Sequence, residues 1–165
     1  MSSTDETLAQ PSAGLELVVL ADLPPALVQP LTATPLWVRR IDGAIKAGFP
    51  SPADDFDTVE IDLIRELVTH PQATFFVRAS GLSMVQAGIN DGDMLLVNRA
   101  LPAAPGHIVV AMVDNEFTVK YLRQRAGRFY LEAANPTFPP IHPRDGQTLR
   151  VFGIVTCAIT KFVKR

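Results

Sequence analysis

The chain has 165 residues, of which 47% are hydrophobic and 19% charged, and its formal net charge is −2. This composition suits one compact domain with some additional length, and the lack of a basic surplus argues against a general nucleic-acid-binding surface. The one cysteine, Cys157, excludes an internal disulfide framework. No run approaches 18 apolar residues and the first residues do not resemble a secretory signal, so we expect a cytoplasmic protein without a membrane span.

Residues 1–34 are rich in proline, alanine, serine and threonine. Repeated prolines interrupt any helix, so this segment is predicted to be a flexible arm that carries a few apolar residues. Residues 36–49 could form one marginal helix or remain extended. The two prolines of FPSPADD then favour an extended path. Small residues on an extended backbone are what a protease cleft accepts.

The remainder of the chain is predicted to be mostly β. Residues 57–71 fit a short helix, because four apolar residues recur at helical spacing before Pro71. Turns rich in Gly, Pro, Asn and Asp then separate six apolar or β-branched runs, which is typical of an antiparallel β domain. VDNE and RAGR are predicted to be hairpin turns. The six runs are residues 74–80, 93–100, 107–113, 116–124, 128–134 and 149–163.

Ser83 lies in a loop of small residues between two of these runs. A serine hydroxyl is a weak nucleophile and needs an adjacent base. His70, His107 and His142 lie outside any familiar triad motif and are interpreted as surface or turn histidines, although a histidine base stays possible. Their spacing does not match a metal site, so we predict neither a metal nor a cofactor.

Lys120 is the other candidate base. A lysine must be neutral to accept a proton, and burial favours the neutral form by lowering its pKa. In the strand predicted over 116–124, Thr118 and Leu122 share a face with Lys120. The alternative is an edge-strand lysine that faces water, and the residues alone leave both open.

Two segments of the sequence resemble a known family. FVRASGLSMVQAGINDGDMLLVNRA, followed by GHIVVAMVDNEFTVKYL, resembles the two catalytic segments of the LexA/UmuD family of self-cleaving Ser-Lys proteins. Ser83 and Lys120 are 37 positions apart, which is the interval that the family uses. AGFPSPADD resembles the family's cleavage segment and VFGIVTCAITKFVKR its final strand, so the resemblance covers about residues 44–165.

The resemblance implies roles for individual residues. Ser83 would be the nucleophile and Lys120 the general base, and the scissile bond would be Ala47–Gly48. Backbone N–H groups near Ser83 would bind the oxyanion. The chain would then consist of a flexible arm, residues 1–47, which self-cleavage removes, and one compact antiparallel domain of the LexA/signal-peptidase type, residues 48–165.

The resemblance favours the UmuD branch of the family. Only 47 residues precede the expected cleavage site, and they are proline-broken and not basic, unlike the helix-turn-helix domain of LexA. A UmuD-like SOS-response protein is cleaved under stimulation by the RecA filament on single-stranded DNA. Its processed form would be a homodimeric accessory subunit of a UmuC-type error-prone translesion polymerase, without specific binding to duplex DNA. Leu82 stands where UmuD proteins often have Asp, and this arm is longer than theirs.

Three other functions remain as alternatives. One is a phage-type repressor that has lost its DNA-binding domain. A type I signal peptidase-like protease also uses a Ser-Lys pair, but it needs an N-terminal membrane anchor. A non-catalytic β-domain binding module would have a turn serine at Ser83 and a surface lysine at Lys120.

Overall fold

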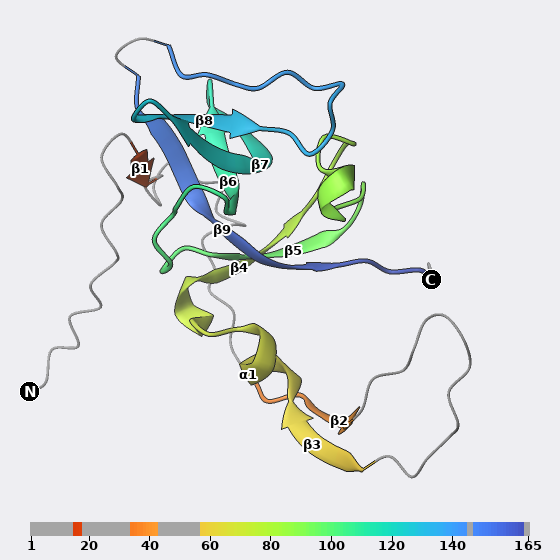
Figure 1. The fold of residues 1–165 in the computed structure, drawn as a ribbon. Coiled ribbons are helices and arrows are strands. Elements are labelled where there is room, and N and C mark those ends of the chain that lie inside the picture. The colour runs from red at the N-terminus through yellow and green to blue at the C-terminus, as the bar shows by residue number, and fades with distance from the viewer. Residues whose placement is uncertain (1–14, 18–33, 43–56, 145–146, 164–165) are drawn as a thin grey trace, which may run out of the picture.

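The structure is a computed structural model that describes residues 15–17, 34–42, 57–144 and 147–163. In this part of the chain the strands form a seven-stranded sheet and a separate two-stranded ribbon (Figure 1). The sheet contains β1 (Leu15–Leu17), β4 (Thr74–Arg78), β5 (Met94–Asn98), β6 (Ile108–Val113), β7 (Glu116–Arg125), β8 (Arg128–Glu132) and β9 (Leu149–Ile159). The ribbon contains β2 (Trp37–Ile41) and β3 (Thr58–Asp62), and the short helices are α1 (Leu63–Leu67), η3 (Pro71–Ala73) and η4 (Val85–Ala87).

The prediction of a mostly β, antiparallel domain is confirmed. The main path of the sheet runs β4-β5-β9-β6-β7-β8, and every neighbouring pair on it is antiparallel. Each of the six predicted runs contains one of these strands, although β9 ends at Ile159 and not at Val163. A parallel pair between β1 and β9 was not predicted.

Two tight turns place β7 between β6 and β8. Asp114 and Asn115 connect β6 to β7, and Ala126 and Gly127 connect β7 to β8. All four residues have positive φ angles, which is the backbone conformation of two-residue hairpin turns of type I′. Both predicted hairpins are therefore confirmed, and they bring Lys120 of β7 into the body of the sheet.

Strand β9 is the centre of the sheet, because it pairs with β1, β5 and β6. The register shifts along both β5 and β6, so β9 carries an extra residue against each neighbour and bends there. At Gly153 a Cβ atom would lie 2.9 Å from both the Asn98 carbonyl oxygen and Val97 Cγ1. A glycine is needed here because β5 and β9 approach closely.

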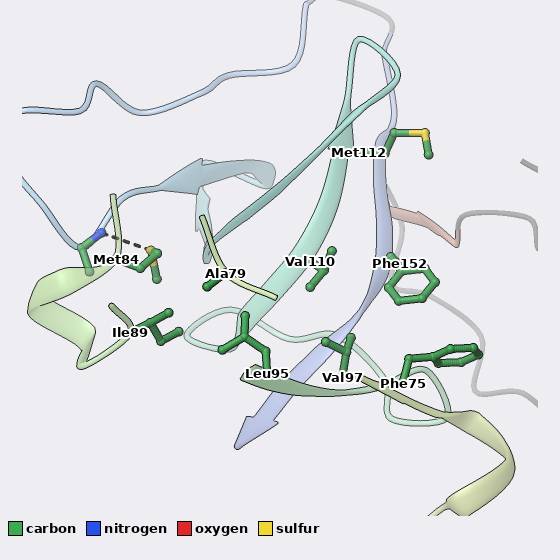
Figure 2. Packing of buried hydrophobic residues seen from close by; sticks show 10 residues of the cluster. Phe75, Ala79, Met84, Ile89, Leu95, Val97, Val110, Met112 and Phe152 are labelled. Carbon is green, nitrogen blue, oxygen red and sulfur yellow. Dashed lines mark hydrogen bonds between the residues drawn. The ribbon is translucent and has the colours of Figure 1, made fainter. Parts of the chain in front are cut away.

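Two apolar clusters fill the domain. Figure 2 shows the first, in which Ala79, Met84 and Ile89 of the loop between β4 and β5 pack against buried side chains of the strands, including Leu95 and Phe152. The second cluster lies around β6 to β9 and includes Leu122, Leu131 and Val151, together with Leu15 of β1. The loop between β4 and β5, residues 79–93, is called the serine loop below because it contains Ser83.

The helix predicted over 57–71 is wrong in its first part. Residues Thr58–Asp62 form β3, which pairs with β2 from Trp37↔Asp62 to Ile41↔Thr58. The helix begins only after Asp62, because the Asp62 carboxylate accepts a hydrogen bond from the Ile64 N–H at 3.1 Å and caps it. Of the two possibilities left open for residues 36–49, the extended one holds for Trp37–Ile41.

The ribbon projects away from the large sheet. In Figure 1 it lies beyond α1, on the side of that helix away from β4 and β5. The expected cleavage residues Ala47 and Gly48 fall between β2 and β3 in the sequence and lie outside the described residues.

Candidate active site

Ser83 is held in the serine loop by contacts at the base of that loop. The Ala79 N–H donates to the Asp93 carbonyl at 2.8 Å, and the Gly92 N–H donates to the Ala79 carbonyl at 2.9 Å. Nearer to Ser83, the Gly81 N–H donates to Asp91 Oδ1 at 2.8 Å, and Gly81 has a φ of 91°, which favours glycine. These hydrogen bonds join the first residues of the serine loop to its last residues, and they fix the backbone just before Ser83.

The segment after β8 holds the serine loop from the other side. The Asn135 side-chain amide donates to the Leu82 carbonyl at 3.0 Å. The Gln86 N–H donates to the Ala134 carbonyl at 2.9 Å, and the Ala134 N–H points at Met84 Sδ at 3.4 Å. Because Met84 is only 3% exposed, the residue that follows Ser83 is anchored in the core. These contacts fix the backbone on both sides of the serine.

The structure brings Lys120 and Ser83 together. Lys120 Nζ donates a hydrogen bond of 2.7 Å to Ser83 Oγ, across 37 positions of sequence. It also donates to Thr118 Oγ1 at 2.9 Å and to the Val119 carbonyl at 3.0 Å. Thr118 is on the same face of β7, two residues before Lys120, so alternation along the strand explains this contact. Three oxygen atoms thus orient the amine toward the serine.

Lys120 is buried and has no opposite charge beside it. The residue is 7% exposed, and no ion pair among the described residues includes it. Burial disfavours the ammonium form and therefore lowers the pKa of Lys120 below the ordinary lysine value of 10.5. The alternative of an edge-strand lysine that faces water does not fit this burial.

Backbone donors also surround Ser83. Within the described residues, no group accepts a hydrogen bond from the N–H of Leu82, Ser83 or Met84. A helix-like turn, η4, starts at Val85 directly after them. Free N–H groups beside a nucleophile are the feature that an oxyanion site requires.

The three histidines make contacts elsewhere and are all exposed. His70 Nδ1 lies 3.0 Å from both Thr69 Oγ1 and Asn98 Nδ2. His107 Nδ1 accepts from the Ala104 N–H at 3.2 Å, and the ring of His142 stacks on Tyr130 with 5.0 Å between centroids. None of these contacts involves Ser83, so the geometry favours lysine as its base.

Three supporting residues were not identified as such from the sequence. Asn135 and Asp91 both lie in turns, NPT and NDGD, whose letters signal a turn but not its contact with another loop. Thr118 was placed on the face of Lys120 but was not given a role. Strand alternation together with a buried lysine would have been enough to indicate the contact between Thr118 and Lys120.

The described part of the chain contains no group of three or more His, Cys, Asp or Glu side chains that could hold a metal ion. It also contains no helix that is long and apolar enough to span a membrane.

The sequence matches the Peptidase S24-like family over residues 39–156. This range covers well over half of the chain and includes both Ser83 and Lys120. The chain belongs to the Peptidase S24-like family. The prediction of a LexA/UmuD-type protein is therefore confirmed.

Curated S24-like relatives agree with this assignment. Protein SamA of Salmonella typhimurium is 42% identical over 134 residues, which is 81% of this chain and 90% of SamA. Protein MucA of Escherichia coli is 44% identical over 74% of this chain and 81% of MucA. The LexA repressor of Arthrobacter is 40% identical over 67% of this chain but only 44% of the repressor, so more than half of the repressor has no counterpart in this match.

Proposed function

We propose that this S24-like protein is a UmuD-like SOS mutagenesis protein that cleaves its own chain between Ala47 and Gly48. Ser83 is the nucleophile and Lys120 the general base. The observation that carries the proposal is the 2.7 Å contact between Lys120 Nζ and Ser83 Oγ, made by a lysine that is only 7% exposed. Burial without a counter-ion among the described residues favours the neutral form of the amine, which is the state that a base needs.

The chemistry proceeds through two steps of acyl transfer. Neutral Lys120 takes the proton of Ser83 Oγ as that oxygen attacks the carbonyl carbon of Ala47. The oxyanion accepts hydrogen bonds from backbone N–H groups of the serine loop. The carbon–nitrogen bond then breaks, and Lys120 passes the proton to the departing Gly48 amine. Water hydrolyses the ester, again with Lys120 as base, and Ala47 leaves as a carboxylate.

The neighbouring strands suggest how cleavage is restrained. β2 ends before the cleavage segment and β3 begins after it, so the ribbon holds both ends of that segment. The ribbon lies beyond α1 in Figure 1, away from the serine loop. The protein exchanges between this arrangement and one in which the segment lies over Ser83, and an activator that binds the second arrangement raises its population.

Partners follow from the family. The activator is the RecA filament on single-stranded DNA, in the cytoplasm, and the processed form, residues 48–165, is a homodimeric accessory subunit of a UmuC-type translesion polymerase. The similarity to SamA and MucA over most of their length supports a UmuD-like protein.

Two alternatives make different demands on the structure. A non-catalytic binding module has no need for a buried lysine, and burial of a lysine without a counter-ion costs stability. A signal peptidase-like enzyme would cleave other chains at a membrane. The buried Ser83–Lys120 contact and the family therefore favour self-cleavage.

Intact mass spectrometry of the purified chain over time tests the proposal. The chain is incubated in neutral buffer, in alkaline buffer, and in neutral buffer with RecA filament on single-stranded DNA. We expect a product that begins at Gly48 to appear in alkaline buffer and with the filament. Ser83→Ala and Lys120→Ala should reduce its rate of formation by at least about 100-fold.

A matched control is Ser80→Ala, because Ser80 is an exposed serine of the same loop that is not assigned a role. It should be cleaved at the parent rate. If the parent stays intact under all three conditions, or if Ser83→Ala is cleaved as fast as the parent, the proposal is wrong.

A further inference from the structure

Strand β1 occupies an edge of the large sheet beside the first part of β9. Its residues pair with β9 in parallel, with Leu15 opposite Leu149, Glu16 opposite Arg150 and Leu17 opposite Val151. β6 pairs with the same part of β9, through Met112↔Arg150 and Ala111↔Val151. In Figure 1 β1 stands beside the first part of β9, so it is the outer strand at this position. The place that β1 fills is called the β1 slot.

The β1 slot contains an apolar socket. Leu15 is 6% exposed and packs in the second core cluster, which also contains Leu149 and Val151 of β9. A three-residue strand that buries a leucine in the core of the domain is bound by side-chain packing as well as by main-chain pairing. The slot therefore selects for an apolar residue at the position of Leu15.

The outer part of the slot has a different character. Glu16 is exposed and lines a surface depression, together with Arg144, Arg150 and Asp114. Two arginines and one aspartate leave the wall cationic by one charge, which suits an acidic residue at the position of Glu16. An apolar residue followed by an acidic one is thus the pattern that fits the slot.

We propose that the β1 slot is a docking site for an extended segment of a separate partner protein, which replaces β1 after the arm has been cut. This inference rests on the proposed self-cleavage, because β1 precedes the Ala47–Gly48 bond and stays tethered to the body until that bond breaks. Without β1, β9 presents an unpaired edge and an open socket, and such an edge binds added strands.

Copies of the same chain are poorer occupants of the slot. A second processed copy begins at Gly48 and carries no residue 15. An intact copy keeps its own β1 close to its own slot, at an effective concentration on the order of millimolar, which a second chain at lower concentration does not match. The occupant therefore comes from a different protein.

A labelled peptide tests the slot directly. The probe is the segment of residues 11–21, PSAGLELVVLA, and its binding to full-length chain is followed by fluorescence anisotropy. All chains carry Ser83→Ala, so that cleavage plays no part. We expect the peptide to bind the Leu15→Asp chain at least about tenfold more tightly than the parent, because β1 no longer competes for the slot.

Matched variants separate docking from unfolding. Thr34→Ser changes an exposed residue of the arm that lies outside β1, so it should exclude the peptide as the parent does. Glu16→Pro removes a main-chain N–H from β1 without placing a charge in the socket, and it should admit the peptide. A peptide with Leu15→Asp should not bind. Hydrogen exchange should show that bound peptide protects the amides of Leu149–Val151.

Several results would overturn the proposal. They are failure of the peptide to bind the folded Leu15→Asp and Glu16→Pro chains, binding to the Thr34→Ser chain as tight as to the Leu15→Asp chain, and protection of a different surface. Protection of the Leu149–Val151 amides of the Leu15→Asp chain when parent chain is added without peptide would identify a second copy as the occupant and would also overturn the proposal. Every chain in the peptide experiment carries Ser83→Ala, so its result does not depend on self-cleavage. A negative peptide result therefore does not contradict self-cleavage, and a negative cleavage result does not contradict peptide binding to the slot.

Discussion

At the scale of single residues, the proposed mechanism makes the activation of Ser83 depend on the protonation of Lys120. Burial lowers the pKa of Lys120, and only the neutral amine accepts the proton of Ser83. We therefore expect the rate of self-cleavage without activator to rise with pH as Lys120 loses its proton, and to level off above its pKa. The rate is measured by mass spectrometry across a pH series from neutral to alkaline.

The matched variant for this pH series is Lys120→Arg. Arginine keeps the charge and nearly the length of lysine but stays protonated throughout the range. Its chain should remain intact at every pH. A rate in the parent that is flat between neutral and alkaline pH would contradict a lysine base.

The same lowered pKa affects stability. Below the pKa of folded Lys120, folding buries a charge at a cost. Between that pKa and 10.5, the ordinary lysine value, the unfolded chain binds the proton and the folded chain does not. The stability of the parent should therefore increase with pH across this window. Lys120→Met removes the effect, so the variant should be more stable than the parent at neutral pH.

Chemical denaturation at several pH values measures this difference in unfolding free energy. The advantage of Lys120→Met should shrink as pH rises and be lost near 10.5. The comparison is made in Ser83→Ala chains to prevent cleavage. A difference that does not depend on pH would show that Lys120 has the same pKa in the folded and unfolded chains.

At the scale of elements, the segment after β8 sets the position of the serine loop. Asn135 uses its amide to donate to the Leu82 carbonyl at 3.0 Å, and its Oδ1 accepts from the Thr137 hydroxyl at 2.8 Å. Asn135→Asp keeps the acceptor and loses the donor. One hydrogen bond contributes about 0.5–1.5 kcal/mol, so we expect cleavage to slow by about 2- to 10-fold without loss of the fold.

Cleavage rates of Asn135→Asp and Thr137→Val are compared under the same conditions. The second variant removes the neighbouring hydrogen bond to Asn135 but leaves the contact with Leu82, so its rate should stay closer to that of the parent. A rate for Asn135→Asp equal to that of the parent would mean that the other contacts of the loop are sufficient to place Ser83.

The approach of β9 to β5 leads to a prediction about stability. An alanine at Gly153 would bring a Cβ atom to 2.9 Å from the Asn98 carbonyl oxygen, which belongs to the backbone and cannot turn aside. We expect Gly153→Ala to lower the free energy of unfolding by about 1–3 kcal/mol, as overpacking does. Urea denaturation measures this change in unfolding free energy. The control is Ala158→Ser, at an exposed position of the same strand. Equal urea midpoints for Gly153→Ala and Ala158→Ser would contradict the close approach of β9 to β5 at Gly153.

Sequence patterns predicted those elements whose causes are local. The hairpins around β7 follow from DN and AG turns between alternating strands. The pairing of Ser83 with Lys120 was implied only by the resemblance of two segments to the LexA/UmuD family, because the residues alone left the base open. β3 was mistaken for helix because its strand form depends on pairing with β2, across positions that no periodic pattern connects. β1 is three residues long, too short for a pattern, and only its packing against β9 defines it.

At the scale of the whole molecule, two described parts of the proposed arm, far apart in sequence, pair with the body. β1 pairs with β9 over three residues, and β2 pairs with β3 over five. Both β1 and β2 precede the proposed cleavage site, whereas β9 and β3 follow it. Breaking the Ala47–Gly48 bond therefore does not by itself release the arm, since two sets of main-chain hydrogen bonds still hold it.

We expect the cut arm to remain bound to the body at first and to leave on dilution. The two attachments act together, because each keeps the other at a high local concentration. Native mass spectrometry of the freshly cleaved protein should show fragment 1–47 in complex with fragment 48–165. Leu15→Asp removes the buried leucine of β1, and burial of such a side chain contributes about 1.5–3 kcal/mol. The arm of this variant should therefore dissociate at a protein concentration roughly 10- to 100-fold higher than the arm of the parent. Thr34→Ser, at an exposed arm residue outside β1, is its control and should behave as the parent does. An arm that leaves the parent body as soon as the bond is cut, at the highest concentration tested, would mean that β1 and β2 stay in place only while the chain is continuous.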